Sequence, residues 1–305
     1  MLTQTQFSTR MDWASGPFPE DHSSSIKDIH IVFLNYLMKE DIINAVRSLY
    51  DDIADCPYEV QITVADNSEN QDHIQEELRE HFPGVLYIDC GGNLGFGKGN
   101  TLGFQAAPAR YYFALNRDTI IPSGTKVIER IVRFMDQHPK IGCMGPKLLN
   151  MDGSLQYSCY RFDLPSILIK PLKQINFDQK YSWVRRRTDG LLMKDFDHES
   201  TRPVDWVLGA ALVVRKEVVD QIGWFDERYF MYLEDADWCR RMWDAAWPVY
   251  YVHDIIIKHS HARGSAQVPG IFKALIKNKL ARVHLKSWFS FLWKWKGSFI
   301  YYRGD

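Results

Sequence analysis

Three carboxylates stand within four residues in the segment Glu234-Asp-Ala-Asp237, directly after the aromatic stretch 224–232. Acidic side chains in the first turn of a helix complement the helix dipole, which is their common structural use. Three of them exceed what capping requires. We therefore expect one to act as a general base that removes a proton from a nucleophile at the mouth of a cleft.

Metal-ligand side chains occur at two other places. Asp118, in Asn116-Arg-Asp-Thr119, has the carboxylate that Mg²⁺ or Mn²⁺ prefers, and a plain turn before Pro122 is the alternative. His259 and His261 follow an apolar run, and side chains at i and i+2 of an extended chain point the same way. Either is a candidate ligand, although a lone histidine is more often structural.

Glycines dominate the loop 91–100, which reads Gly-Gly-Asn-Leu-Gly-Phe-Gly-Lys-Gly-Asn. Such a loop lets backbone N–H groups approach an anion at the start of a helix. It fails the P-loop pattern because Gly99 follows Lys98 where a hydroxyl is required. It fails the dinucleotide pattern because Asn100 and Leu102 replace glycine. The alternative is a tight strand-to-helix turn without a ligand.

Hydrophobic spacing predicts the elements that position these residues. Strands are expected at 28–34, 58–65, 85–89, 111–115, 141–145, 204–214 and 249–257, with helices between them. Asp41 and Ser123 are expected to be helix N-caps. The alternation is typical of an α/β fold with a mainly parallel sheet covered by helices, which the second half of the chain extends.

Ligands of such sheets bind at the carboxyl ends of the strands. The residues that follow the first four strands are Asn35, Asp66 with Asn67, the glycine-rich loop, and 116–119. The carboxylate of Asp66 is suited to accept hydrogen bonds from a nucleobase or a ribose, and an Asx-turn or a helix cap is the alternative.

The 305 residues have a net charge of −1, which argues against a nucleic-acid binder. That total hides a division, because residues 271–305 hold eight Lys or Arg and a single acid. Five cysteines without a C-x-x-C pair, no signal peptide and no long apolar run indicate a cytoplasmic protein without a transmembrane helix. Residues 1–27 resemble a flexible leader or linker.

The basic segment 271–305 also contains nine Phe, Trp or Tyr residues. Cationic and aromatic side chains together are typical of a segment that lies on an anionic membrane. The alternatives are a helix that packs its tryptophans against the body of the protein and, less favoured by the acidic remainder, RNA binding.

Together these motifs resemble glycosyltransferase family 2, and most closely its rhamnosyltransferase-like branch, which builds bacterial surface polysaccharides. The resemblance covers residues 28–265 and rests on six segments in the family's order: Asn93–Asn100, Leu115–Thr119, 145–156 (Gly-Pro-Lys-Leu-Leu and Asp-Gly-Ser-Leu-Gln), Trp206–Ala211, Gly223–Asp235 and His259–Arg263. It implies a GT-A fold over 28–265, with a nucleotide-sugar half at 28–149, an acceptor half at 150–265 and a membrane-surface tail at 266–305.

The resemblance also implies roles for individual residues. Asp235 is the expected catalytic base, with Glu234 second, and the expected metal ligands for Mg²⁺ or Mn²⁺ are Asp118, His259 and His261. The expected donor-binding residues are Asn35, Asp66, Asn67, Asn93, Gly95, Gly97, Lys98, Asn100, Asn116, Arg117, Trp206 and Gly209.

The sequence departs from the family at its metal motif. Asn116 stands where a carboxylate is common, and Arg117 replaces the proline of the rhamnosyltransferase-like branch. This leaves two readings open: a metal held with help from His259, or a fixed positive charge from Arg117 beside the phosphates.

The expected reaction is an inverting transfer of a sugar, with L-rhamnose from dTDP-rhamnose the first choice. The acceptor is a hydroxyl of a lipid-linked glycan for O-antigen or another surface polysaccharide. The chain then works at the inner face of the cytoplasmic membrane. The alternative function is a non-catalytic nucleotide-sugar or glycan-binding module within a larger synthase.

Overall fold

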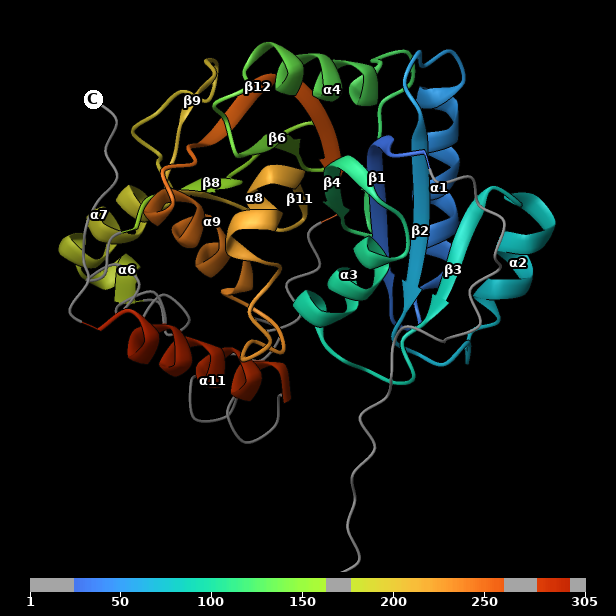
Figure 1. Cartoon of the computed structure of the whole chain (residues 1–305). Helices are drawn as coiled ribbons and strands as arrows, with labels where there is room; N and C mark the ends of the chain where they lie inside the picture. Colours follow the sequence, from blue (N-terminus) through green and yellow to red (C-terminus); the bar gives the residue numbers. More distant parts are fainter. Residues whose placement is uncertain (1–24, 163–176, 261–278, 297–305) are drawn as a thin grey trace, which may run out of the picture.

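The computed structural model describes residues 25–162, 177–260 and 279–296. Its centre is a ten-stranded sheet with the order β3-β2-β1-β4-β11-β6-β12-β5, to which β7 adds beside β6 and β9 beside β12 (Figure 1). β8 (Cys159–Tyr160) and β10 (Trp206–Val207) form a separate pair.

The first half of the chain builds the parallel part of the sheet. Its strands β1 to β4 are parallel neighbours, and their apolar runs are buried as the sequence predicts. The strands and the helices between them are β1 (Lys27–Asn35), α1 (Lys39–Ile53), β2 (Val60–Asp66), α2 (Ile74–His81), β3 (Val85–Asp89), α3 (Phe96–Gln105) and β4 (Ala109–Leu115).

The second half extends the same sheet, as expected. β11 is antiparallel to both β4 and β6, whereas β12 is parallel to β6 and antiparallel to the short β5. The remaining elements are β5 (Thr119–Ile120), α4 (Val127–Gln137), β6 (Cys143–Leu149), β7 (Leu155–Gln156), α6 (Phe177–Lys180), α7 (Ser182–Leu191), β9 (Arg202–Pro203), β11 (Ala211–Arg215), α8 (Lys216–Ile222), α9 (Glu234–Asp244), β12 (Val249–His259) and α11 (Lys279–Lys294).

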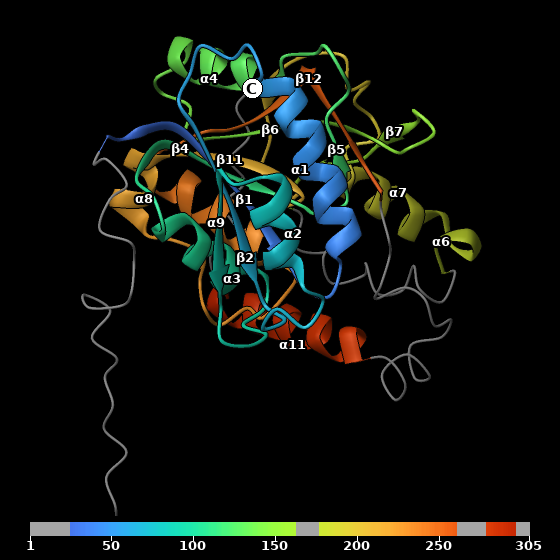
Figure 2. The same ribbon diagram turned by 90° about the vertical axis from the view of Figure 1, so that its right-hand side faces the viewer.

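Helices cover both faces of the sheet and enclose two hydrophobic cores. Apolar side chains of α1, α2 and α4 fill one core, and those of α3, α8 and α9 fill the other (Figure 2). The second core also takes Phe291 of α11, which runs along the lower end of the molecule in both views. Within the described residues, no helix is long and apolar enough to span a membrane.

The two predicted N-caps are wrong. α1 begins two residues before Asp41, where Asn35 Oδ1 accepts the N–H of Met38 at 3.1 Å. α4 begins at Val127 rather than after Ser123, and the buried carboxylate of Asp52 accepts the N–H groups of Val127 and Ile128, both at 2.9 Å. At α4 a side chain distant in the sequence therefore supplies the acceptor that a local cap would have provided.

Candidate active site

Sheet pairing brings Asp118 and His259 together. β5 pairs with the end of β12, so that Thr119 lies opposite His259, and the N–H of Ser260 donates to the backbone oxygen of Asp118 at 2.8 Å. His259 Nε2 then lies 3.2 Å from Asp118 Oδ1. Two predicted metal ligands separated by 141 positions in the chain thus meet at one sheet edge.

The electrostatics of this pair suit a cation. Burial alone would raise the pKa of Asp118, but the hydrogen bond and charge of His259, together with the charge of Arg117, hold it below its ordinary value. The carboxylate is therefore ionised and can bind Mg²⁺ or Mn²⁺. No cluster of three or more acidic, histidine or cysteine ligands occurs among the described residues, and His261 lies outside them. Metal binding stays a prediction.

The two residues that depart from the family motif lie beside this pair. Asn116 Nδ2 is 3.3 Å from His259 Nε2, so the amide that replaces a carboxylate contacts the histidine directly. Arg117 is half-buried, and its Nε has no hydrogen-bond partner within the described part of the chain. The side chains of Asn116 and Arg117, which were both predicted to contact the donor, therefore lie at the candidate metal site.

Asp66 is buried at the end of β2 and fully engaged with its own neighbours. Its oxygens accept hydrogen bonds from Asn35 Nδ2 at 2.9 Å, Tyr87 Oη at 3.0 Å and the N–H of Asn70 at 2.6 Å, besides two from Ser68. The carboxylate thus shapes the turn after β2. Its predicted contact with a base or ribose, and that of Asn35, remain predictions.

The glycine-rich loop owes three glycines to close packing. A Cβ on Gly97 would lie 2.9 Å from Phe225, and one on Gly99 would lie 2.4 Å from Leu34. Gly95 has φ +84°, and a Cβ there would lie 2.0 Å from the backbone oxygen of Phe230. The alternative of a tight turn therefore explains these positions without a ligand.

The polar residues of this loop mostly bind one another. Asn67 Nδ2 donates to the Gly95 carbonyl at 3.1 Å, Asn93 Oδ1 accepts the Gly95 N–H at 3.1 Å, and Asn100 Nδ2 donates to the Phe96 carbonyl at 2.9 Å. Lys98 is 44% exposed and lies 3.5 Å from Glu227. Lys98 is thus reachable from solvent, and its contact with a phosphate stays a prediction.

The start of α9 holds the two candidate bases differently. Asp235 Oδ2 accepts the N–H of Gly209 at 2.9 Å, and Oδ1 accepts the N–H of Ala236 at 2.8 Å. Glu234 is 5% exposed, and its Oε2 has no hydrogen-bond partner among the described residues. Burial and the adjacent charge of Asp235 raise the pKa of Glu234 well above its ordinary value. Backbone N–H groups therefore stabilise the charged form of Asp235, and its role as the base stays a prediction.

The segment 206–209 contacts the candidate base and the aromatic core. The N–H of Gly209 donates to Asp235 Oδ2 at 2.9 Å, and the predicted contact of Gly209 with the donor stays a prediction. Trp206 is 4% exposed and stacks on Tyr160 at 4.0 Å between ring centroids, and its Nε1 has no hydrogen-bond partner in the described ranges. A donor contact by Trp206 stays a prediction.

A backbone hydrogen bond joins the glycine-rich loop to the aromatic loop 223–233. The N–H of Phe96 donates to the carbonyl of Phe230 at 2.8 Å, and the ring of Phe96 packs edge-on against Phe225. The aromatic loop leads directly into Glu234 and Asp235. These contacts therefore join the glycine-rich loop, which is predicted to bind the donor, to the segment that carries the candidate base.

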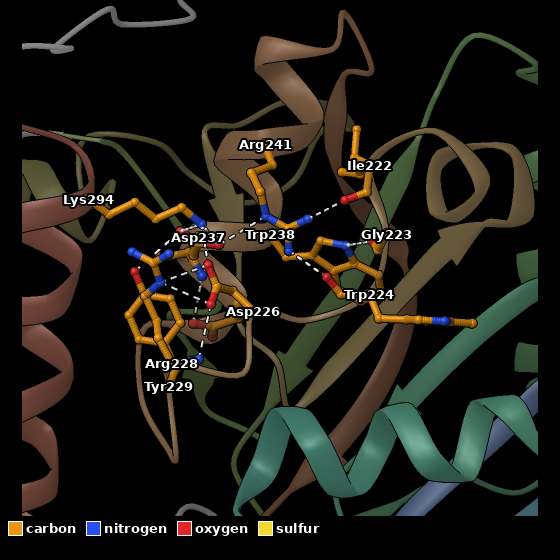
Figure 3. A network of polar contacts seen from close by, with 12 residues as sticks. Ile222, Gly223, Trp224, Asp226, Arg228, Tyr229, Asp237, Trp238, Arg241 and Lys294 are labelled. Atoms are coloured by element: carbon orange, nitrogen blue, oxygen red, sulfur yellow. Dashed lines mark hydrogen bonds and ion pairs between the residues drawn. The ribbon is translucent and has the colours of Figure 1, made fainter. Parts of the chain in front are cut away.

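Sequence reasoning missed the buried network around Asp237 (Figure 3). This carboxylate is fully buried and forms an ion pair with Lys294 Nζ at 2.7 Å. It also accepts hydrogen bonds from Trp295 Nε1 and Arg241 Nε, both at 3.0 Å. Lys294 also lies 2.7 Å from Asp226 of the aromatic loop. α11 is thereby fixed to the loop and to the helix that carries the candidate base. The sequence signal for partners elsewhere was the single acid among the eight Lys or Arg of residues 271–305.

Residues 28–191, more than half of the chain, match the family model described as glycosyl transferase family 2. Among curated proteins, the chain is 27% identical over 219 residues to the N-acetylglucosaminyl-diphospho-decaprenol L-rhamnosyltransferase of Mycobacterium tuberculosis, covering 69% of each chain. It is 26% identical to the rhamnosyltransferase WbbL of Escherichia coli, covering 76% of this chain and 81% of that one.

The fold is similar to that of solved glycosyltransferases. GalNAc-T7 with UDP, GalNAc and Mn²⁺ matches with a TM-score of 0.55 and 12% identity over 84% of this chain and 48% of its own. The mannosyltransferase PcManGT of Pyrobaculum calidifontis, in complex with GDP-Man and Mn²⁺, matches with a TM-score of 0.51 and 10% identity, over 87% and 70%. The fold is therefore GT-A, as predicted.

Proposed function

The chain belongs to glycosyl transferase family 2, and we propose that it is an inverting enzyme that moves a sugar from a nucleoside diphosphate to a hydroxyl of a lipid-linked glycan. The observation that carries this proposal is the candidate base. Asp235 is fixed by the N–H of Gly209 and lies where the aromatic loop meets the glycine-rich loop.

In this mechanism Asp235 removes the proton from the acceptor hydroxyl as the hydroxyl oxygen attacks the anomeric carbon. The nucleoside diphosphate leaves from the opposite face of the sugar, which inverts the configuration. Asp118 and His259 would hold a divalent metal, and Arg117 adds a positive charge beside them. When bound, that metal would stabilise the negative charge of the leaving diphosphate.

L-rhamnose is the sugar that we assign to the donor, with deoxythymidine as the nucleoside. The support is the pair of rhamnosyltransferases among the relatives. The names of these relatives also favour a diphospho-lipid acceptor and a place in O-antigen or other surface polysaccharide synthesis. A hexosyltransferase of Haloferax volcanii, Agl10, at 27% identity over 71% of this chain, makes other hexoses the next donors to try.

We place the enzyme at the inner face of the cytoplasmic membrane, with the tail 271–305 as its contact. Within the described part of the tail, α11 packs one face against the body of the protein, as the packing alternative expects. Its other face exposes Phe289 by 58% and Trp293 by 72%. This second face leaves a surface for anionic lipid.

The deciding experiment is donor turnover across a panel of nucleotide sugars, measured as release of the nucleoside diphosphate. We expect dTDP-rhamnose to be turned over fastest, with Mn²⁺ activating and EDTA lowering the rate. If EDTA leaves the turnover rate unchanged, the charge of the leaving diphosphate would be stabilised by Arg117 alone. Binding of a donor without hydrolysis or transfer, with any member of the panel, would instead favour a non-catalytic binding module.

A further inference from the structure

The hairpin between β6 and β7 contacts the candidate metal site through one side chain. Gln156 Oε1 lies 2.7 Å from His259 Nδ1, and both residues are buried, at 8% and 3% exposure. Gln156 belongs to the Asp152-Gly-Ser-Leu-Gln156 segment, which has no role in the transfer reaction proposed above. This contact lies on the ring nitrogen that faces away from Asp118.

The surrounding hydrogen bonds fix which end of the Gln156 amide faces the histidine. Gln156 Nε2 lies 3.0 Å from Asn150 Oδ1 and 3.5 Å from the backbone oxygen of His259, and both of these atoms are acceptors. The NH₂ group must therefore point at them, which turns Oε1 toward His259. An oxygen acceptor at 2.7 Å requires that Nδ1 carry a proton.

Asn150 is oriented by the same hairpin. Its Nδ2 donates to Ser154 Oγ at 2.8 Å, and Ser154 donates through its N–H and its Oγ to Asp152 Oδ1, at 2.9 and 2.6 Å. The pairing of β6 with β7 sets Gln156 opposite Leu148 and holds the hairpin backbone. A chain of hydrogen bonds thus runs from an exposed turn to a buried imidazole.

We propose that Gln156 is a positioning residue that keeps a proton on Nδ1 of His259, so that Nε2 is the ring nitrogen that can exchange its hydrogen bond with Asp118 for a cation. Histidines that bind metals commonly donate their other N–H to an oxygen acceptor, which fixes the tautomer and the ring orientation. With Nδ1 protonated, Nε2 can bind a cation shared with Asp118. This inference rests on the proposed function for the identity of that cation and deepens it.

The first test reads the tautomer directly, with Mg²⁺ and dTDP present, so that the cation can take the place of the Nε2 proton beside Asp118. In protein labelled with ¹⁵N-histidine at alkaline pH, where imidazole is neutral, the His259 signals are identified by their absence from His259→Gln. We expect the parent and Gln156→Glu, which keeps an acceptor oxygen, to hold the Nδ1–H form. Gln156→Leu is expected to populate the Nε2–H form. A parent ring that is mainly Nε2–H would overturn the proposal.

The second test measures Mn²⁺ binding by electron paramagnetic resonance in the presence of dTDP. Gln156→Leu is expected to weaken Mn²⁺ binding about 10- to 100-fold, and Gln156→Glu to stay within about threefold of the parent. Gln61→Leu, which makes the same change at a half-buried glutamine on β2, is the control for general effects and is expected to bind as the parent does.

The outcomes separate this inference from the proposed function. Equal Mn²⁺ binding by Gln156→Leu and the parent, or no Mn²⁺ binding by the parent, would overturn the positioning role. If Mn²⁺ binding depends on Gln156 while no nucleotide sugar is turned over, the inference stands and the transferase proposal fails.

Discussion

Glu234 and Asp235 are neighbours in the chain, yet their surroundings suit them to different protonation states. The backbone N–H groups of Gly209 and Ala236 stabilise a charged Asp235. Glu234 is buried beside that charge. The glycine-rich loop packs closely against it, since a Cβ added at Gly97 would lie 3.7 Å from the Cβ of Glu234. Burial and the charge of Asp235 raise the pKa of Glu234, so we expect the reaction to depend on Asp235 as its base.

The first prediction compares the two carboxylates as bases. Asp235→Asn keeps the shape and one acceptor oxygen for Gly209 but cannot take a proton, so sugar transfer should fall by about 10² or more. Donor binding, followed by calorimetry with dTDP, should be unchanged. Glu234→Gln is the matched control and should retain transfer within about tenfold. Unimpaired turnover by Asp235→Asn would remove this residue from the role.

The second prediction concerns pH and the stability cost of Glu234. Because its folded pKa is raised above the ordinary value of 4.5, the folded state is favoured below that value. This stability is lost as the pH rises toward the folded pKa. Glu234→Gln cannot ionise, so its melting temperature should exceed that of the parent at neutral pH. The gap should close below pH 4.5. A constant gap across this range would show that Glu234 does not titrate there.

At the scale of elements, local pattern predicted the strands of the first half well and helix starts poorly, and the single strand expected at 204–214 is divided into β10 and β11. β3 begins and ends at the predicted residues, because the apolar run 85–88 is followed by Asp89 and bounded by turn residues. The start of α4 could not be predicted from Ser123, since the acceptor for its first N–H groups is Asp52, on another helix. Caps supplied from elsewhere in the fold leave no local signal.

The same limit applies to the site. Asp118 and His259 could be predicted individually as residues that follow strands, because the carboxyl ends of strands collect ligands. That they meet depends on β5 pairing with β12, which neither segment predicts alone. Gln156 was recognised as part of a motif, but its role needs the register of β6 with β7.

The third prediction tests the contact that fixes α11. Lys294 forms ion pairs with Asp226 and Asp237. Burial would raise the pKa of Asp226, but the pairing with Lys294 is the main reason that this pKa falls to about 2. Lys294→Met leaves Asp237 with Arg241 but removes a buried partner, so the free energy of unfolding should fall by about 1–3 kcal/mol. Urea denaturation at neutral pH measures the change.

Lys286→Met, at an exposed position of the same helix, is the control for the loss of a charge and should change stability by less than about 0.5 kcal/mol. The low pKa of Asp226 adds a pH signature. Its contribution is present above the ordinary value of 3.8 and is lost as the pH falls toward about 2. As the pH falls from 3.8 toward about 2, the free energy of unfolding should therefore decrease less in Lys294→Met than in the parent. Equal slopes would contradict the pairing.

For the whole molecule, the near-neutral total charge conceals an arrangement in space. α11 and the turn that follows it have exposed cations and aromatics at intervals of three and four residues: Lys279, Arg282, Lys286, Phe289, Trp293 and, in the turn, Lys296. Such spacing places them along one side of a helix. The opposite side is held by the acidic body through Asp226 and Asp237, so the exposed stripe keeps a fixed orientation relative to α9 (Figure 3).

The fourth prediction follows from this orientation. A membrane bound by the stripe lies next to the loop that precedes Asp235, since Ser287 Oγ donates to the carbonyl of Met231 at 2.7 Å and His284 stacks on Tyr232. Phe289→Ser with Trp293→Ser removes the two most exposed aromatics of the helix without touching these contacts. Flotation with phosphatidylcholine–phosphatidylglycerol vesicles should fall at least about tenfold.

Trp183→Ser is the matched control, because Trp183 of α7 is 50% exposed and lies outside the stripe. It should float as the parent does. Arg282→Glu with Lys286→Glu should weaken flotation on the anionic vesicles, and added salt should weaken that of the parent, since both act on attraction to the lipid charge. Transfer to a water-soluble acceptor should be unchanged in the aromatic double variant, which separates membrane binding from chemistry. If that variant floats as well as the parent, α11 does not contact the membrane, and another segment must bring the base to a lipid-linked acceptor.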